Sequence, residues 1–308
     1  MSEQKTIFEG LYQIDWVQLG HIYGSRPSIS AIPDAIRDLL SESENIRESS
    51  RGFLFGEGAQ EYGMITNSTP HLMRFIFDLL PLEETPERER LLRWIASMLD
   101  EYLGTKGYSS IRNMRNYMAV YDLAEQHLPL IVKLLKHTES DIRYQAAALL
   151  GKLNDSLDTA VYELIAQFRL ETSQDVQVSI LEALTDLFRI YNHRSIDLRK
   201  HCEPFFRDVV ETHPSHKVRY AAACAGLFAA PSTMFHQTRQ DEISLRTSSV
   251  FVDEFWHCYE EYAESYSVEA VLEKLILLPD CTEKLRQIIE DERLSDETKL
   301  FLKRSYGV

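Results

Sequence analysis

The chain has 308 residues, 44% of them apolar and 26% charged, with only 12 glycines and 10 prolines, which excludes a disordered or collagen-like protein. Its longest run of small apolar residues, 221–230, covers half of the ~20 residues that a membrane-spanning helix needs, and no basic segment followed by an apolar one opens the sequence, so we expect a protein that is neither membrane-bound nor exported. The net charge of −15 argues against a general nucleic-acid binder and favours a basic partner.

Paired helices are predicted from residue 32 onward. The segment 32–40 carries apolar residues on one helical face, and after a polar turn Ile46-Arg47 opens a second helix. A further first helix begins near Pro70, 37 residues after Pro33, and both prolines suit the first turn of a helix.

The clearest helical hairpin spans residues 128–151. In 128–136 apolar residues recur at the spacing of one helix face, and a polar turn leads to 142–151, whose alanines favour close packing. The interval from Pro70 to Pro129 is 59 residues, longer than one repeat. We place the excess in an inserted loop at about 102–116, which is rich in turn-forming residues.

The second helices of the hairpins begin alike. Ile142-Arg143-Tyr144 and Val218-Arg219-Tyr220 both precede an alanine run that ends at a glycine, and Val176 stands between them at intervals of 34 and 42 residues. Such internal similarity indicates a repeat protein. The two later hairpins have first helices at 161–168 and 202–210 and second helices at 176–184 and 218–226.

Residues 231–308 diverge from the repeat. Residues 241–308 hold 16 acidic and 8 basic side chains, so we expect an acidic C-terminal cap after a connector at 231–239. The helices predicted there cover 251–266, 268–278, 282–290 and 295–303.

The two-helix unit of 37 to 42 residues, with a first-helix proline and an Asp-Val/Ile-Arg turn, resembles the HEAT-repeat (PBS-lyase HEAT-like) superfamily. Asp141-Ile142-Arg143 fits the turn fully, while Asp175-Val176-Gln177 and Lys217-Val218-Arg219 each differ at one position. The resemblance implies an all-α fold: a right-handed α-α superhelical solenoid of HEAT-like helical hairpins that holds another macromolecule on an elongated surface.

The N-terminal segment carries a more specific resemblance. Asp15-Trp16, Leu19, His21 and Tyr23-Gly24, followed by Ile32-Pro33, are similar to the opening of a group of bacterial HEAT-repeat proteins. In that group a glycine-bearing loop precedes the second repeat; residues 56–63 take this place here without the expected histidine-glutamine pair. The resemblance implies a fold and a binding style, and no reaction.

No catalytic or cofactor motif is complete. Gly56-x-Gly58-x-x-Glu61 lacks the third glycine of a dinucleotide fingerprint, and P-loop, zinc-protease and serine-hydrolase motifs are absent. His213 and His216 lie within a hairpin while His193 and His201 lie between hairpins, so we expect no metal site. We predict no enzyme and no cofactor.

The cysteines and tryptophans are expected to be structural. The four cysteines form no C-x-x-C pair and no compact disulfide module, which favours reduced thiols and a cytoplasmic location. Trp16, Trp94 and Trp256 are each flanked by apolar residues at helical spacing and suit a core. The most basic stretches, 189–201 and 106–117, could contact nucleic acid or an acidic protein, but we favour solvated loops.

We predict a non-catalytic binding or scaffold protein: a single solenoid over 1–308, with a cap at 1–31, repeats at 32–230 and acidic helices at 231–308. A basic protein such as a toxin is one concrete partner. The alternative is a HEAT-like enzyme directed at DNA or similar to bilin lyases, which would need a basic concave face. The candidate binding residues open the second helices; for Arg143 and Arg219 the other reading is pairing with carboxylates of adjacent repeats. These candidates are Arg143, Tyr144, Gln177, Arg219 and Tyr220.

Overall fold

The structure, a computed structural model, describes a defined part of the chain: residues 8, 10–19, 30–58, 60–61, 64–104, 111–190, 196–229, 250–251, 254–255 and 257. Within these residues the fold is helical apart from one antiparallel pair of two-residue strands, which confirms the all-α prediction. The strands are β1 (Gln60–Glu61) and β2 (Met64–Ile65). None of the described helices combines the length and the apolar character needed to cross a membrane.

The chain divides into two compact units, Met1–Ala160 and Val161–Val308. The helix α10 (Leu157–Phe168) runs across this boundary, and α11 (Gln174–Ile190), α12 (Ile196–Thr212) and α13 (His216–Ala229) belong to the second unit. One continuous array over the whole chain stays a prediction. The first unit contains α2 (Trp16–Leu19), α3 (Ile32–Asp38), α4 (Glu44–Gly52), the π-helical turn η2 (Phe53–Gly58), α5 (Thr69–Leu79), α6 (Arg88–Gly104), α7 (Ile111–Gln126), α8 (Leu128–Leu134) and α9 (Ser140–Leu150).

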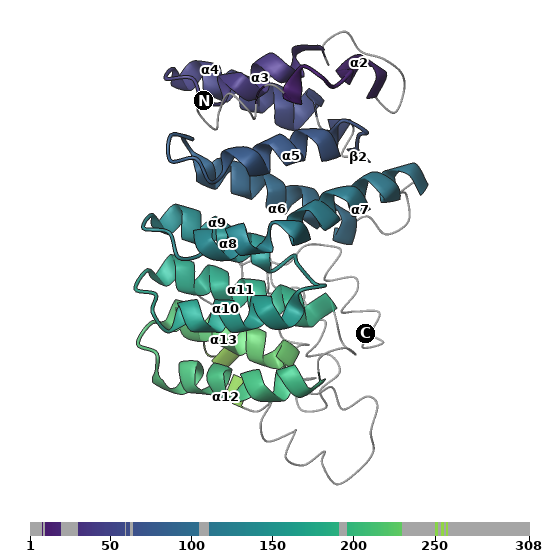
Figure 1. The fold of residues 1–308 in the computed structure, drawn as a ribbon. Coiled ribbons are helices and arrows are strands. Elements are labelled where there is room, and N and C mark those ends of the chain that lie inside the picture. Colours follow the sequence, from purple (N-terminus) through teal and green to yellow (C-terminus); the bar gives the residue numbers. More distant parts are fainter. Residues whose placement is uncertain are drawn as a thin grey trace, which may run out of the picture. The chain divides into compact units, whose positions relative to one another are not determined.

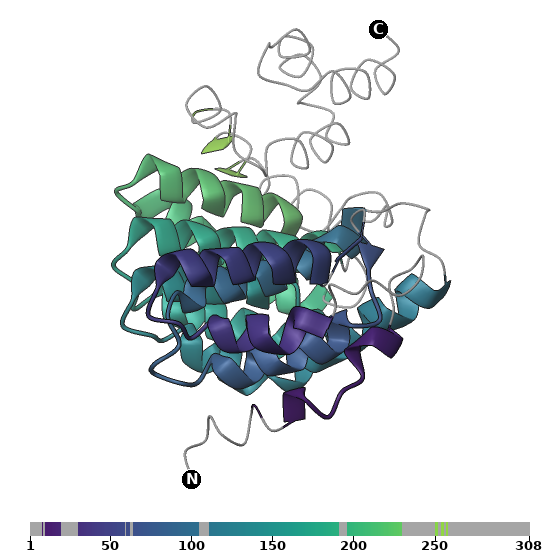
Figure 2. The same cartoon turned by 90° about the horizontal axis from the view of Figure 1, so that it is seen from above.

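Helices of the first unit pack in successive pairs. α3 packs on α4 and on α5, and α5 packs on α7. Both α6 and α8 pack on α9 (Figures 1 and 2). The apolar stripe of α5 explains its place between neighbours, because Leu72, Met73 and Ile76 are fully buried while His71 and Arg74 face solvent. α5 therefore packs between α3 and α7.

Three first helices begin at the predicted prolines. Pro33, Pro70 and Pro129 occupy the first or second position of α3, α5 and α8, where a missing backbone N–H costs no helical hydrogen bond. Pro204 differs from this pattern, because it lies inside α12, which begins at Ile196. The predicted first helix at 202–210 was therefore too short at its N-terminal end.

Much of the predicted inserted loop at 102–116 is helical instead. α6 continues to Gly104 and α7 begins at Ile111, so both long helices absorb the additional residues, and 105–110 lie outside the described residues. Similarly, the basic stretch 189–201 is not one loop, since α11 ends at Ile190 and α12 starts at Ile196. The expected loop at 56–63 begins inside η2 and continues into β1.

In the second unit, α11 and α12 both pack on α13. Every residue of α13 from Tyr220 to Ala229 is buried, and its alanines allow the neighbouring helices to approach closely. Gly226 lies inside this helix rather than at its end. A side chain is disfavoured there because the buried ring of Phe251 occupies the space where a Cβ would be. The helices predicted over 258–308 and the connector at 231–239 lie outside the described residues.

Candidate functional site

A seven-residue turn recurs between first and second helices in the described part of the chain. In each copy the side chain of the seventh residue, an arginine or glutamine, donates a hydrogen bond to the backbone carbonyl of the first. This bond satisfies a carbonyl that the end of the first helix leaves open. The donor and acceptor pairs are Arg47 with Ser41, Arg143 with His137, Gln177 with Glu171 and Arg219 with His213, at 2.8, 2.9, 2.9 and 3.1 Å.

The first residue of each turn also accepts a hydrogen bond through its side chain. The donor is the backbone N–H of the third residue, which directly precedes the second helix. The first position therefore holds a residue whose side chain can accept a hydrogen bond. His137 and His213 accept through Nδ1, so neutral forms of these two rings carry their proton on Nε2. The pairs are Ser41 with Ser43, His137 with Glu139, Glu171 with Ser173 and His213 with Ser215.

The predicted binding residues occupy these turns and the helices behind them. The Arg143, Gln177 and Arg219 side chains hold turn carbonyls, and Gln177 is only 8% exposed. Tyr144 is half-buried, whereas Tyr220 is 3% exposed and stacks on Phe255 at 5.5 Å between ring centroids. The structure thus gives Arg143, Gln177, Arg219 and Tyr220 internal contacts, and a role of the five predicted residues in binding stays a prediction.

Successive hairpins are joined by ion pairs of the turn residues. Arg47 Nε lies 2.8 Å from Glu87 Oε2, and Arg219 Nε lies 2.7 Å from Glu254 Oε1. Arg219 therefore contacts a carboxylate 35 residues further along the chain, and the alternative interpretation, pairing between adjacent repeats, stays a prediction. Lys217 adds a 2.7 Å pair to Asp175 of the preceding turn.

Glu87 is the centre of the best-connected of these ion pairs. It accepts from Arg47 and from the buried Arg51, and Arg90 Nε lies 3.3 Å from its other carboxylate oxygen. Burial raises the pKa of Glu87, but the hydrogen bonds from Arg47 and Arg51 outweigh burial and hold this pKa below its ordinary value. Its backbone has a φ of 53°, an uncommon conformation for a residue with a Cβ. The local strain is thus compensated by three guanidinium contacts.

Exposed carboxylates gather beside these turns in the first unit. Between the turns at 41–47 and 137–143 lies the turn that links α5 to α6, residues 80–87. The Arg47–Glu87 pair joins it to the first of these turns, and Arg88, directly after it, lies close to His137 of the other, with 3.2 Å between Nη2 and Nε2. The three turns therefore lie next to one another. We define the turn edge as their exposed carboxylates Glu42, Glu44, Glu83, Glu84, Glu139 and Asp141.

The turn edge has a negative balance because three nearby arginines are engaged internally. Arg47 and Arg51 bind Glu87, and Arg143 binds backbone carbonyls. Lys136 and Arg90 are exposed cations beside the same turns. Six carboxylates against these two cations produce a local negative potential that a positively charged surface would complement.

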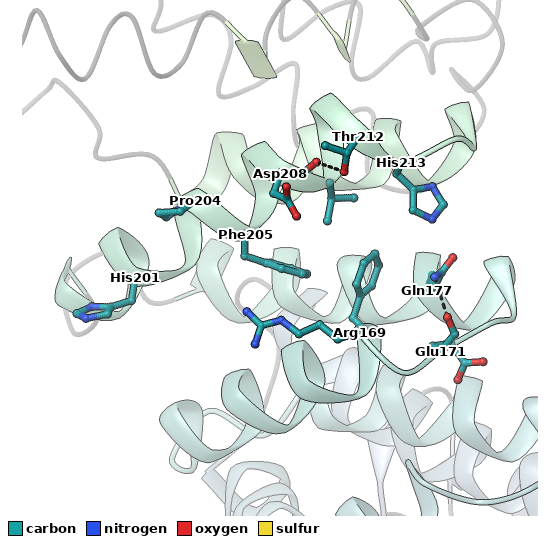
Figure 3. Close-up of a pocket in the computed structure, with 11 residues that line it drawn as sticks. Arg169, Glu171, Gln177, His201, Pro204, Phe205, Asp208, Thr212 and His213 are labelled. Atoms are coloured by element: carbon teal, nitrogen blue, oxygen red, sulfur yellow. Dashed lines mark hydrogen bonds between the residues drawn. The ribbon is translucent and has the colours of Figure 1, made fainter.

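A cavity of about 530 Å³ opens in the second unit between the end of α10 and the face of α12. Figure 3 shows the Phe205 side chain pointing into it from α12, with Asp208 above and Arg169 below. Phe168 meets Phe205 edge-to-face at 5.2 Å between ring centroids and His213 at 6.4 Å. The remaining lining residues are Glu171, Gln177, His201, Pro204, Val209 and Thr212.

Two charged side chains of the cavity, Arg169 and Asp208, have no ionic partner among the residues that the structure describes. The carboxylate of Glu171 accepts from the N–H groups of residues 172 and 173 and is buried. By contrast, Arg169 and Asp208 are exposed, and no described residue forms an ion pair or side-chain hydrogen bond with the guanidinium or the carboxylate. The repeat pattern predicted one lining residue, Gln177, but it missed Phe205 and Asp208 on α12 and Arg169 at the end of α10, because these do not belong to the recurring turn.

The described residues offer little for metal or thiol chemistry. No group of three or more histidine, cysteine, aspartate or glutamate side chains among them could hold a metal ion. His201 lies in α12 and His213 in the turn after it, while His193 is outside the described residues. Burial raises the pKa of Cys202 to about 12, so its thiol is a poor nucleophile at neutral pH.

Trp16 and Trp94 are buried, as expected, and Trp256 lies outside the described residues. Trp16 Nε1 donates to the carbonyl of Leu11 at 2.9 Å, and its ring contacts His71 and Phe75. The N-terminal motif thereby fixes α2 onto α5, whereas His21 and Tyr23 of the same motif are outside the described residues.

Comparisons with known proteins leave the family open. No family model matches the chain, and no curated protein matches it. Among solved structures, the crystal structure of an engineered protein from the Northeast Structural Genomics Consortium matches over 89% of this chain and 94% of its own, with 13% sequence identity and a TM-score of 0.44. A similarity this low supports no conclusion about fold or function.

Proposed function

We propose that this protein is a non-catalytic binding protein whose acidic turn edge recognises a basic surface of another protein. The observation that carries the proposal is the group of six exposed carboxylates on three adjacent turns, where Arg47 and Arg51 are held by Glu87. Electrostatic complementarity of this kind raises the association rate and selects partners by charge. A basic toxin or nuclease is one example of such a partner.

The proposal includes an α-α solenoid of HEAT-like repeats as the scaffold. The repeated seven-residue turn supports it, because the same carbonyl-to-side-chain bond recurs at Arg47, Arg143, Gln177 and Arg219. Stacked hairpins of this kind display successive turns along one edge, so a partner can be bound by many side chains at once without a deep pocket.

We also propose a cytoplasmic location. Cys202 and Cys224 are buried free thiols, and neither is joined in a disulfide. Reduced cysteines are usual where the compartment keeps thiols reduced.

Two variants of equal net charge test the proposal. Glu42→Lys, Glu83→Lys and Glu139→Lys reverse three carboxylates of the turn edge, whereas Asp122→Lys, Asp155→Lys and Asp158→Lys reverse three exposed carboxylates elsewhere. Binding to immobilised lysozyme, a basic probe protein, is measured at several salt concentrations, with circular dichroism as the check of folding. We expect the edge variant to lose at least about tenfold more affinity than the other variant. Equal losses would show that only total charge matters and would contradict the proposal.

A further inference from the structure

The cavity between α10 and α12 has the chemistry of a side-chain pocket. Its volume of about 530 Å³ suits one large side chain together with the adjoining main chain of a bound segment. Phe168 is buried, but Phe205 is only half-buried, so an aromatic surface remains open to a ligand. Its aromatic wall therefore favours an apolar or aromatic group.

Apolar surface continues outside the cavity. Leu170, directly after the lining residue Arg169, is 76% exposed, and Tyr162, two helical turns earlier on α10, is 62% exposed. Large side chains left this accessible beside an aromatic cavity are typical of a surface that another molecule covers. A ligand longer than one side chain would reach them.

The charged side chains around the cavity favour a particular charge next to the apolar group of a ligand. The Asp208 side chain lies above Phe205 in Figure 3 and is exposed. Glu211, also exposed, follows one turn later on α12 and adds a second negative charge near this end of the helix. These carboxylates favour a cation in the ligand. Arg169 has only donors, which suit the main-chain carbonyls of a peptide, while two nearby carboxylates make the site unfavourable for a free anion.

We infer that this cavity binds a peptide segment in which a large apolar side chain is followed by a basic residue. The apolar side chain packs against Phe168 and Phe205, the basic side chain pairs with Asp208, and the guanidinium of Arg169 donates to main-chain carbonyls of the segment. This inference rests on the proposed function, because it names a second feature of the same basic partner: an accessible apolar-basic segment.

An amide-resolved NMR titration tests the inference with three synthetic peptides. The probe is acetyl-Ser-Gly-Phe-Lys-Gly-Ser-amide, and its controls carry serine in place of phenylalanine or glutamate in place of lysine. We expect saturable shifts at the amides of residues 168–171 and 205–213 with the probe, no saturable shifts with the serine peptide, and at least about fivefold weaker binding of the glutamate peptide, which is the effect of one partly exposed ion pair. Absence of saturable shifts at millimolar probe, or equal binding of all three peptides, would overturn the inference.

Two protein variants locate the binding. Asp208→Asn is expected to weaken the probe about fivefold, and Asp158→Asn, which removes an exposed carboxylate from the far end of α10, is expected to leave it unchanged. Equal effects of the two variants would contradict the pocket. If the probe peptide does not bind while the turn-edge variant still loses more lysozyme affinity than its control, only this inference is overturned. If the probe peptide binds while the two charge-reversed variants lose the same lysozyme affinity, only the proposed role of the turn edge is overturned.

Discussion

Arg47 and Glu87, 40 residues apart in the sequence, join two turns through a hydrogen bond of 2.8 Å between Nε and Oε2. The same guanidinium also donates to the carbonyls of Ser41 and Glu42 through Nη1. One side chain thus closes its own turn and fixes the next one. Arg219 likewise closes its own turn by donating to the carbonyl of His213, and it also donates to the helical residue Glu254.

Glu87→Gln should lower the free energy of unfolding by about 2 to 4 kcal/mol, because it leaves the enclosed guanidinium groups of Arg47 and Arg51 without their anion. The pKa of Glu87 is lowered in the folded state, so its contribution is complete above the ordinary glutamate pKa and is lost as the pH falls through the lower, folded-state pKa. Urea denaturation between pH 7 and pH 3 measures both effects. The wild-type advantage should shrink toward acid; a pH-independent difference would contradict the ionic explanation. Glu83→Gln, in the same turn but exposed, is the control and should change stability by less than about 0.5 kcal/mol.

Arg143→Ala should destabilise the protein by about 1 to 3 kcal/mol, since it removes charge-assisted hydrogen bonds to the carbonyls of His137 and Thr138. Arg143→Gln should cost less, because Gln177 makes the equivalent bond to Glu171 in its own turn. Chemical denaturation of both variants distinguishes the turn role from a purely surface role. Two variants that both match wild-type stability would show that the bond does not hold the turn.

Sequence periodicity predicted the helical pairs where local rules decide them. Pro33, Pro70 and Pro129 begin helices because a first-turn proline is a local preference. Pro204 does not begin a helix, because it lies inside α12, which starts at Ile196. A helix tolerates an internal proline when its tertiary packing is sufficient. The Arg47–Glu87 pair and the α10–α12 cavity depend on how hairpins stack, which spacing along the sequence does not contain.

Gly226→Ala should destabilise the second unit by about 1 to 3 kcal/mol despite the better helix propensity of alanine. A Cβ at this position would lie 2.5 Å from the buried ring of Phe251, too close without movement of that ring. A double-mutant cycle with Phe251→Leu measures the contact by thermal denaturation. We expect the cost of Gly226→Ala to fall by at least about 1 kcal/mol in the Phe251→Leu background; strictly additive effects would refute the clash.

The thiol of Cys202 should resist alkylation in the folded protein. Burial raises its pKa to about 12, so the reactive thiolate is scarce at pH 8, and the side chain is only 3% exposed. Iodoacetamide labelling followed by peptide mass spectrometry measures this residue separately from the other cysteines. Labelling should be at least about a hundredfold slower than in urea-unfolded protein; equal rates would place this thiol at the surface.

Carbodiimide cross-linking of the protein to bound lysozyme tests the central claim most directly, because the reagent joins a carboxylate only to an amine in contact with it. The account predicts that cross-links identified by mass spectrometry at low salt concentrate on Glu42, Glu83, Glu139 and the other carboxylates of the turn edge, and that they disappear at high salt. Cross-links spread evenly over exposed carboxylates such as Asp122 and Asp158, or absent from the turn edge, would contradict it.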